Sequence, residues 1–100
     1  MKKIPNIHPG EILSEEFLTP LNISAYRLAK ETNISAIRVS EIVRKKRRIT
    51  VDTALRLSRF FGNSAEFWLG LQLEYDIREE EKNLKNELKK IHNYKELQRT

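Results

Sequence analysis

The chain has 100 residues, no cysteine and a formal net charge of +5. This length allows one domain with a modest core, and the lack of cysteine excludes disulfides and thiolate-bound metals. No stretch reaches the roughly 18 apolar residues that cross a membrane, and the first residues lack the apolar run of a secretory signal. We therefore expect a cytoplasmic protein with an acidic partner, most simply nucleic acid.

The sequence predicts an all-α fold, because no segment alternates apolar and polar residues as a strand would. The first helix should run from Pro9 to about Leu18, since proline suits a first helical turn and Pro20 then prevents continuation. Four further helices follow, each preceded by a hydroxyl side chain that can cap a helix N-terminus. They are expected at residues 25–32, 36–44, 51–61 and 65–77, after Ser24, Ser35, Thr50 and Ser64.

A charged tail at residues 78–100 follows a domain at residues 1–77. Leu84, Leu88 and Ile91 recur in the tail at helical spacing, and Glu–Lys pairs three or four residues apart support a helix. We expect the tail to be helical with a fraying end.

Helical periodicity also predicts the core of the domain. The residues expected to be buried are Ile12, Phe17, Leu28, Ala29, Val39, Ile42, Val51, Leu55 and Phe61, with Ile34 and Ile49 filling two turns.

Two of the expected helices are separated by only a short turn. Residues 25–32 and 36–44 flank the three-residue segment "NIS", which begins with Asn33. Asparagine tolerates the left-handed conformation that ends helices, and Ala29 is small where the two helices must cross. The pattern resembles the Cro/C1 (XRE-like) helix-turn-helix family over roughly residues 10–70, although that family most often has glycine where this chain has Asn33. The alternative is an ordinary helical hairpin.

Basic residues are concentrated in the same region. Residues 23–50 carry eight cations and two acids, whereas a solvated surface would scatter them. If the second helix of the motif lies in a major groove, its outward residues near the N-terminus contact base edges. These expected base contacts are Ser35, Ala36, Ile37, Arg38, Ser40, Glu41 and Arg44. Arg38 and Arg44 suit guanine, whereas Glu41 suits cytosine or orients an arginine; the alternative for each is a solvated side chain.

The consecutive cations Arg44 to Arg48 follow this helix and complement the negative end of its dipole. They would lie beside the flanking phosphates, as would the N-termini of the helices that begin after Ser24 and Thr50. The expected phosphate contacts are Ser24, Tyr26, Arg27, Lys45, Lys46, Arg47, Arg48 and Thr50. A nuclear-localisation patch and an unengaged solvated loop are the competing interpretations.

A narrower resemblance rests on "IHPGEIL", "ISAYRLA", "RRITVDTALRLSRFFG" and especially "EFWLGLQLEYDI". Over residues 7–77 these motifs are similar to HigA-type antitoxins of type II toxin–antitoxin systems. The resemblance implies a dimeric repressor of its own promoter that neutralises a HigB-type, RelE-class mRNA endonuclease. It implies no role for the tail.

The helix at 65–77 is apolar on two sides. Phe67, Leu71 and Tyr75 form one stripe, while a second stripe consists of Leu69, Leu73 and Ile77. A helix of this kind cannot bury both stripes in its own small core. We expect the second stripe to meet a partner, most simply a second copy bound to a palindromic operator. Complete burial of the helix is the alternative.

Catalytic patterns are missing from the sequence. His8 and His92 are far apart, no histidine pair has zinc-binding spacing, and there is no glycine-rich phosphate loop. We therefore expect neither an enzyme nor a cofactor. Two rival functions stay open: a repressor with no toxin, and a protein-interaction module whose basic face is incidental.

Overall fold

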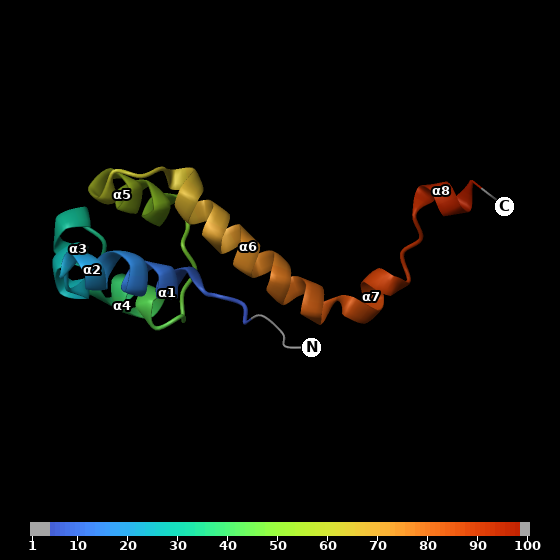
Figure 1. Ribbon diagram of the computed structural model, residues 1–100, viewed down its shortest axis with the longest axis horizontal. Coiled ribbons are helices and arrows are strands. Elements are labelled where there is room, and N and C mark those ends of the chain that lie inside the picture. Colours follow the sequence, from blue (N-terminus) through green and yellow to red (C-terminus); the bar gives the residue numbers. More distant parts are fainter. Residues whose placement is uncertain (1–4, 99–100) are drawn as a thin grey trace.

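The computed structural model describes residues 5–98. Within that range the chain is helical with no strand, as the sequence predicted (Figure 1). The elements in chain order are α1 (Pro9–Ile12), the π-helical turn η1 (Leu13–Leu18), α2 (Thr19–Leu21), α3 (Ala25–Thr32), α4 (Ala36–Val43), α5 (Val51–Phe61), α6 (Ala65–Asn83), α7 (Lys85–Lys89) and α8 (Tyr94–Leu97). None of the described helices is both long and apolar enough to span a bilayer.

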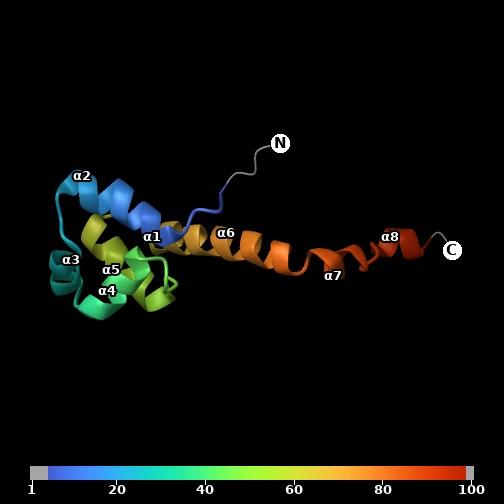
Figure 2. The same ribbon diagram turned by 90° about the horizontal axis from the view of Figure 1, so that it is seen from below.

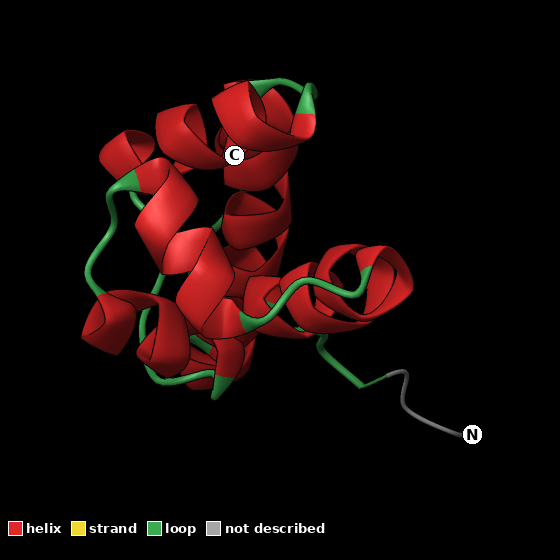
Figure 3. Cartoon of the chain, turned by 90° about the vertical axis from the view of Figure 1, so that its left-hand side faces the viewer, coloured by secondary structure: helices red, strands yellow, loops and turns green. Residues whose placement is uncertain are grey.

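The molecule is elongated, with principal extents of 61 × 29 × 21 Å. Helices α1 to α5 cluster at one end, and α6 leads away from them toward α7 and α8 (Figures 1 and 2). Seen end-on, the helices surround a common centre and are joined by short loops (Figure 3). Helix α6 continues through residues 77 and 78, so the charged tail begins within this helix.

Helix boundaries follow the local chemistry of the sequence. Ser24, Ser35 and Ser64 each accept a hydrogen bond from the backbone N–H three residues later, at 3.0, 3.1 and 3.0 Å. Asn33 and Gly62 end α3 and α5 in the left-handed conformation, with φ of 56° and 79°. The turn between α3 and α4 therefore forms with asparagine where glycine is more usual.

The expectation that Pro20 ends the first helix is wrong. The helix continues through Pro20 and stops at Asn22, which is left-handed with φ of 55°. The wide π turn precedes the proline, and the Thr19 N–H bonds to the Ser14 carbonyl five residues back. This local widening accommodates a ring that would clash with a regular α-helical turn.

The core is centred on Trp68, which is fully buried. Its ring packs against Phe17, Phe61 and Phe67, with centroids 4.8, 5.9 and 5.0 Å away. The indole N–H donates to the Asn63 side chain at 2.9 Å, so its polar atom is satisfied. Leu28, Ala29, Ile34, Val39, Ile42 and Ile49 are buried as expected.

Two of the expected core residues are exposed instead. Val51 and Leu55 are 60% and 56% exposed, whereas Thr53, Ala54 and Leu57 form the buried face of α5. Both sets have helical spacing, so periodicity could not choose between them. The smaller Thr53 and Ala54 permit close approach of the neighbouring helices. Ile12 is half-buried, while the adjacent Leu13 is 1% exposed.

The segment before α1 is attached to α6. The Asn6 side chain donates to the Tyr75 carbonyl at 3.0 Å and to the Glu79 carboxylate at 2.9 Å, and the bond to Glu79 lowers the pKa of that acid. The His8 ring meets Tyr75 edge-on at 4.9 Å and accepts a bond from the Gly10 N–H. Burial lowers the pKa of His8, because the charged imidazolium would be poorly solvated there.

Gly10 allows α1 to approach α4 closely. A Cβ at this position would lie 1.8 Å from the carbonyl oxygen of Ile42. Gly70 on α6 is different, because a Cβ there would meet nothing within 4 Å. Of these two glycines, packing requires only the first.

We predict opposite effects for alanine at these two glycines. Gly10→Ala should lower the free energy of unfolding by about 1–3 kcal/mol, because α1 must move away from α4. Gly70→Ala is the matched control and should raise it by about 0.5–1 kcal/mol, since alanine is the better helix former. Urea denaturation measures both values. Equal changes in the two variants would contradict the close packing at Gly10.

Candidate nucleic-acid interface

Helix α4 presents a polar and exposed face opposite its buried one. Val39 and Ile42 are each 1% exposed and hold the helix against the core. Their burial turns Ser35, Ala36 and Ile37 outward, and Ile37 is 72% exposed. An isoleucine exposed to this degree contributes nothing to the core, and it lies where a groove-binding helix would meet thymine methyl groups.

The other predicted base contacts lie along the same helix. Arg38, Ser40 and Glu41 are half-buried, as is Val43, and Arg44 follows at the C-terminal end. Glu41 accepts hydrogen bonds from the Arg47 guanidinium, with its Oε1 2.7 Å from Nη2. It therefore orients an arginine in the isolated chain.

The basic loop, which we define as Arg44 to Arg48, begins with a Schellman turn. The N–H of Lys45 bonds to the Ile42 carbonyl at 3.0 Å, and that of Lys46 bonds to the Glu41 carbonyl at 2.8 Å. Lys45 itself is left-handed, with φ of 66°, although it carries a side chain. Sequence patterns did not indicate this turn, because glycine is the usual residue at the position.

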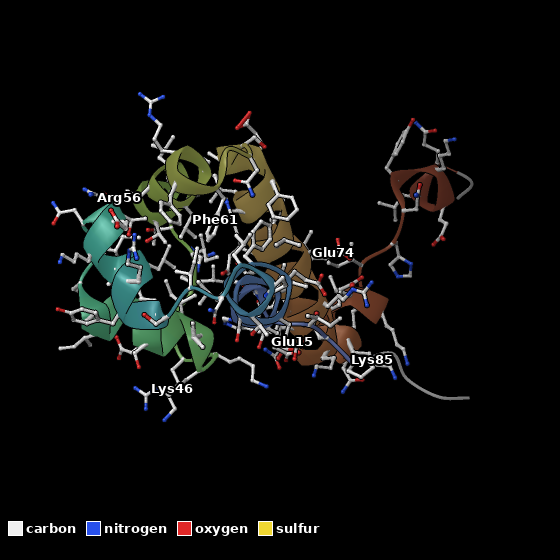
Figure 4. All side chains as sticks on the ribbon, turned by 60° about the vertical axis from the view of Figure 1, so that its left-hand side comes forward. Glu15, Lys46, Arg56, Phe61, Glu74 and Lys85 are labelled. Carbon is white, nitrogen blue, oxygen red and sulfur yellow. The ribbon has the colours of Figure 1, made fainter. Side chains whose placement is uncertain are left out.

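Three cations of the basic loop are paired with acids. Lys45 Nζ lies 3.1 Å from Glu11, and Arg47 is bound to Glu41 as described above. Arg48 Nη2 lies 2.5 Å from Asp76 on α6. Arg44 and Lys46 have no acidic partner among residues 5–98. Lys46 projects from the outer edge of the domain in Figure 4, so the unpaired charge faces solvent.

Helix α6 holds the end of the basic loop through two polar side chains. The buried Gln72 accepts a hydrogen bond from the Ile49 N–H at 2.7 Å and donates to Asp76 at 2.9 Å. Asp76 in turn pairs with Arg48. Sequence reasoning missed both residues, since only the fold brings them to the loop.

Two further helix N-termini contain predicted phosphate contacts, that of the first helix of the motif and that of α5. At α3, Ser24 caps the helix, Tyr26 is 72% exposed, and Arg27 pairs with Glu31 at 2.7 Å. At α5, Thr50 caps the helix and borders an open hollow. The hollow is lined by Arg38, Arg47, Arg48, Thr50, Asp52 and Thr53. The three arginines in this lining are each paired with an acid: Arg38 with Asp52, Arg47 with Glu41 and Arg48 with Asp76.

A charged network connects α5 to both helices of the motif. Asp52 accepts from Arg38 at 3.1 Å and from Arg56 at 2.9 Å. Arg56 also donates to the carbonyls of Thr32 and Asn33, at 3.2 and 3.3 Å, and Figure 4 shows it over the end of α3. The hydrogen bond from Arg56 is the main cause of the lowered pKa of Asp52. The i,i+4 spacing of Asp52 and Arg56 was visible in the sequence, but the link to Arg38 was not.

The second apolar stripe of α6, which was predicted to contact a partner, is only partly exposed. Leu69 is half-buried and packs against the core, whereas Leu73 and Ile77 are 60% and 46% exposed. Farther along, Leu84, Leu88 and Ile91 are 40%, 45% and 70% exposed. Among residues 5–98 no cluster of acids and histidines could hold a metal ion.

A similar sequence and fold occur in known proteins. Residues 15–68 match the helix-turn-helix family. Virulence-associated protein I of Dichelobacter nodosus is 54% identical over 76 residues, which cover 76% of this chain and 70% of that protein. The chain belongs to the helix-turn-helix family of Cro/C1 type, whose members are DNA-binding proteins and not enzymes.

Solved structures indicate which group within this family the chain resembles. An addiction module antidote protein of the HigA family from Coxiella burnetii is 46% identical with a TM-score of 0.85, covering 91% of this chain and all of that one. The Pseudomonas aeruginosa antitoxin HigA, solved with the higBA promoter, is 42% identical with a TM-score of 0.85, covering 88% and 97% of the two chains. Within the helix-turn-helix family, the chain is thus of the HigA antitoxin type.

We predict that the buried hydrogen bond from the Ile49 N–H to Gln72 matters more for stability than the partly exposed ion pair next to it. Gln72→Leu should lower the free energy of unfolding by about 1–3 kcal/mol, because the Ile49 N–H is left buried without an acceptor. Asp76→Asn removes the partly exposed pair with Arg48 and should cost at most about 1 kcal/mol. Urea titrations of both variants give the comparison, and a larger loss for Asp76→Asn would reverse this ranking.

Proposed function

We propose that the chain is a sequence-specific DNA-binding antitoxin that represses its own operon as a dimer. The observation that carries the proposal is the outward face of α4, where Ser35, Ala36 and Ile37 are exposed and Arg38 is half-buried, and which is followed by the basic loop. A helix placed in this way fits the major groove with its N-terminal residues at the base edges. The proposed base contacts are Ser35, Ala36, Ile37, Arg38, Ser40, Glu41 and Arg44.

The phosphate contacts are proposed to flank this helix. On one side lies the basic loop with Thr50, and on the other the N-terminus of α3 with Ser24, Tyr26 and Arg27. Arg44 and Lys46 are free to meet phosphates at once, because they have no acid to leave among the described residues. Lys45, Arg47 and Arg48 would break their ion pairs with acidic side chains when they bind phosphates.

Binding to an operator is supported by the relatives. The Pseudomonas aeruginosa HigA structure contains promoter DNA. Another relative, the antitoxin GraA, is 35% identical and was solved in complex with its operator. A two-fold protein is the simplest reader of a palindromic site, since each copy then contacts one half.

Neutralisation of a toxin is the second half of the proposal. The HigA resemblance points to a HigB-type, RelE-like mRNA endonuclease, and both proteins would act in the cytoplasm, where mRNA is translated. The exposed Leu73 and Ile77 on α6 offer an apolar surface for the toxin or for a second copy. A repressor with no toxin is the remaining alternative, and finding a gene for a small basic protein beside this one would favour the antitoxin.

Base reading and phosphate binding should separate in DNA-binding titrations. Arg38→Ala should relax preference at one base pair of each half-site, at a cost of about 1–3 kcal/mol for the preferred base. Lys46→Ala should weaken all duplexes alike and make the salt slope of log K shallower by about 0.9, since one phosphate is no longer neutralised. Fluorescence anisotropy with the gene's own upstream duplex measures both. If Arg38→Ala weakens binding to all duplexes equally, Arg38 does not read a base.

The partner surface is tested by co-expression with the adjacent small basic protein. Leu73→Ser together with Ile77→Ser should abolish co-purification or yield monomers, while leaving the domain folded because neither side chain is buried. Leu84→Ser, at a similarly exposed position farther along the chain, is the control. Sedimentation that finds the same stable assembly in both variants would assign the contact to other residues.

A further inference from the structure

The network around Asp52 suggests that a residue outside the proposed base contacts controls the orientation of Arg38. One oxygen of the Asp52 carboxylate, Oδ1, accepts hydrogen bonds from both Arg38 and Arg56. Arg56 is itself fixed by the Thr32 and Asn33 carbonyls at the end of α3. A continuous path of hydrogen bonds therefore runs from the turn of the motif to the arginine proposed to read a base.

Resting on the proposed function, we infer that Asp52 is a specificity-determining residue. It holds the Arg38 guanidinium in the orientation that reads guanine, without touching DNA itself. Asp52 is a positioning residue in this scheme, and Arg56 fixes the carboxylate that does the positioning.

The donor inventory of Arg38 agrees with this role. Asp52 takes a hydrogen bond from Nη1 alone. Nε and Nη2 have no partner among residues 5–98 and form one edge of the planar guanidinium. Because guanine accepts two parallel bonds at O6 and N7, that free edge is enough to read it.

Restraint of Arg38 should favour the correct base selectively. A free arginine side chain has many rotamers, and part of that rotamer entropy is lost when it docks on guanine. A side chain already held by Asp52 loses less on docking. Duplexes that lack the guanine do not order Arg38, so their affinity gains nothing from the restraint by Asp52. The difference in affinity between duplexes with and without the guanine therefore grows.

The alternative role for Asp52 is purely structural. It lies in the first turn of α5, where an acid interacts favourably with the positive end of the helix dipole. Glu66 occupies the corresponding position in α6, two residues after the capping Ser64, and has no ion pair among the described residues. Glu66→Gln is therefore a matched control for the dipole effect alone.

The test compares Asp52→Asn, Glu66→Gln, Arg38→Ala and the double variant of Asp52 and Arg38 in the full chain. One probe is the segment of the gene's own upstream DNA that the protein protects from nuclease cleavage. The others are duplexes of this segment with single base-pair changes. Discrimination is the ratio of dissociation constants for changed and unchanged duplexes, and urea denaturation gives the stability of each variant.

We expect Asp52→Asn to lower discrimination about two- to tenfold at the base pair read by Arg38, since ordering one such side chain on binding costs about that much. The salt slope should not change. Glu66→Gln should alter stability only, and the double variant should discriminate no less than Arg38→Ala alone.

Three results would overturn the inference, and they can be told apart. One result is that Arg38→Ala lowers discrimination at one base pair while Asp52→Asn leaves discrimination at that base pair unchanged. In that case Asp52 has only a structural role. If Arg38→Ala relaxes no base pair, base reading by Arg38 fails as well, and with it part of the proposed function. A further loss in the double variant would show that Asp52 acts independently of Arg38.

Discussion

The burial of Val39 and Ile42 is the constraint on which the rest of the structure depends. These two side chains fix the rotation of α4, and that rotation decides which residues face outward. Gly10 lets α1 approach the carbonyl end of the same helix, so α4 is held at both its face and its end. A reading helix must be rigid to place its side chains at base edges, and its rigidity here comes from packing and not from the polar residues that would contact DNA.

Helix α6 has two functions that were hard to separate from sequence. Through Trp68 it closes the core, and through Gln72 and Asp76 it holds the end of the basic loop. The exposed Leu73 and Ile77 lie on the same helix, next to the residues that fix the loop. A partner on α6 would therefore lie close to Asp76 and its ion-pair partner Arg48, which is one of the proposed phosphate contacts.

The sequence predicted the parts of the fold that depend on local chemistry. Hydroxyl caps and the left-handed Asn33 determined the helix boundaries of the motif, and its core residues followed from periodicity. Periodicity failed on α5, where Val51 and Leu55 had the same spacing as the residues that are buried. Proline chemistry failed at Pro20, because the π turn before it was not foreseeable. The Asp52 network and the loop contacts of Gln72 and Asp76 join residues 14 to 28 positions apart, which only tertiary structure brings together.

The most direct test of the central claim is amide NMR during titration with duplex DNA. The gene's own upstream duplex and a scrambled duplex of equal length are added at the same salt concentration. If α4 lies in the groove, amides at 35–41 shift with the first duplex only, while those at 44–48 shift with both, because phosphates are common to all sequences. Identical shifts at 35–41 with both duplexes, or shifts confined to α6, would contradict the account.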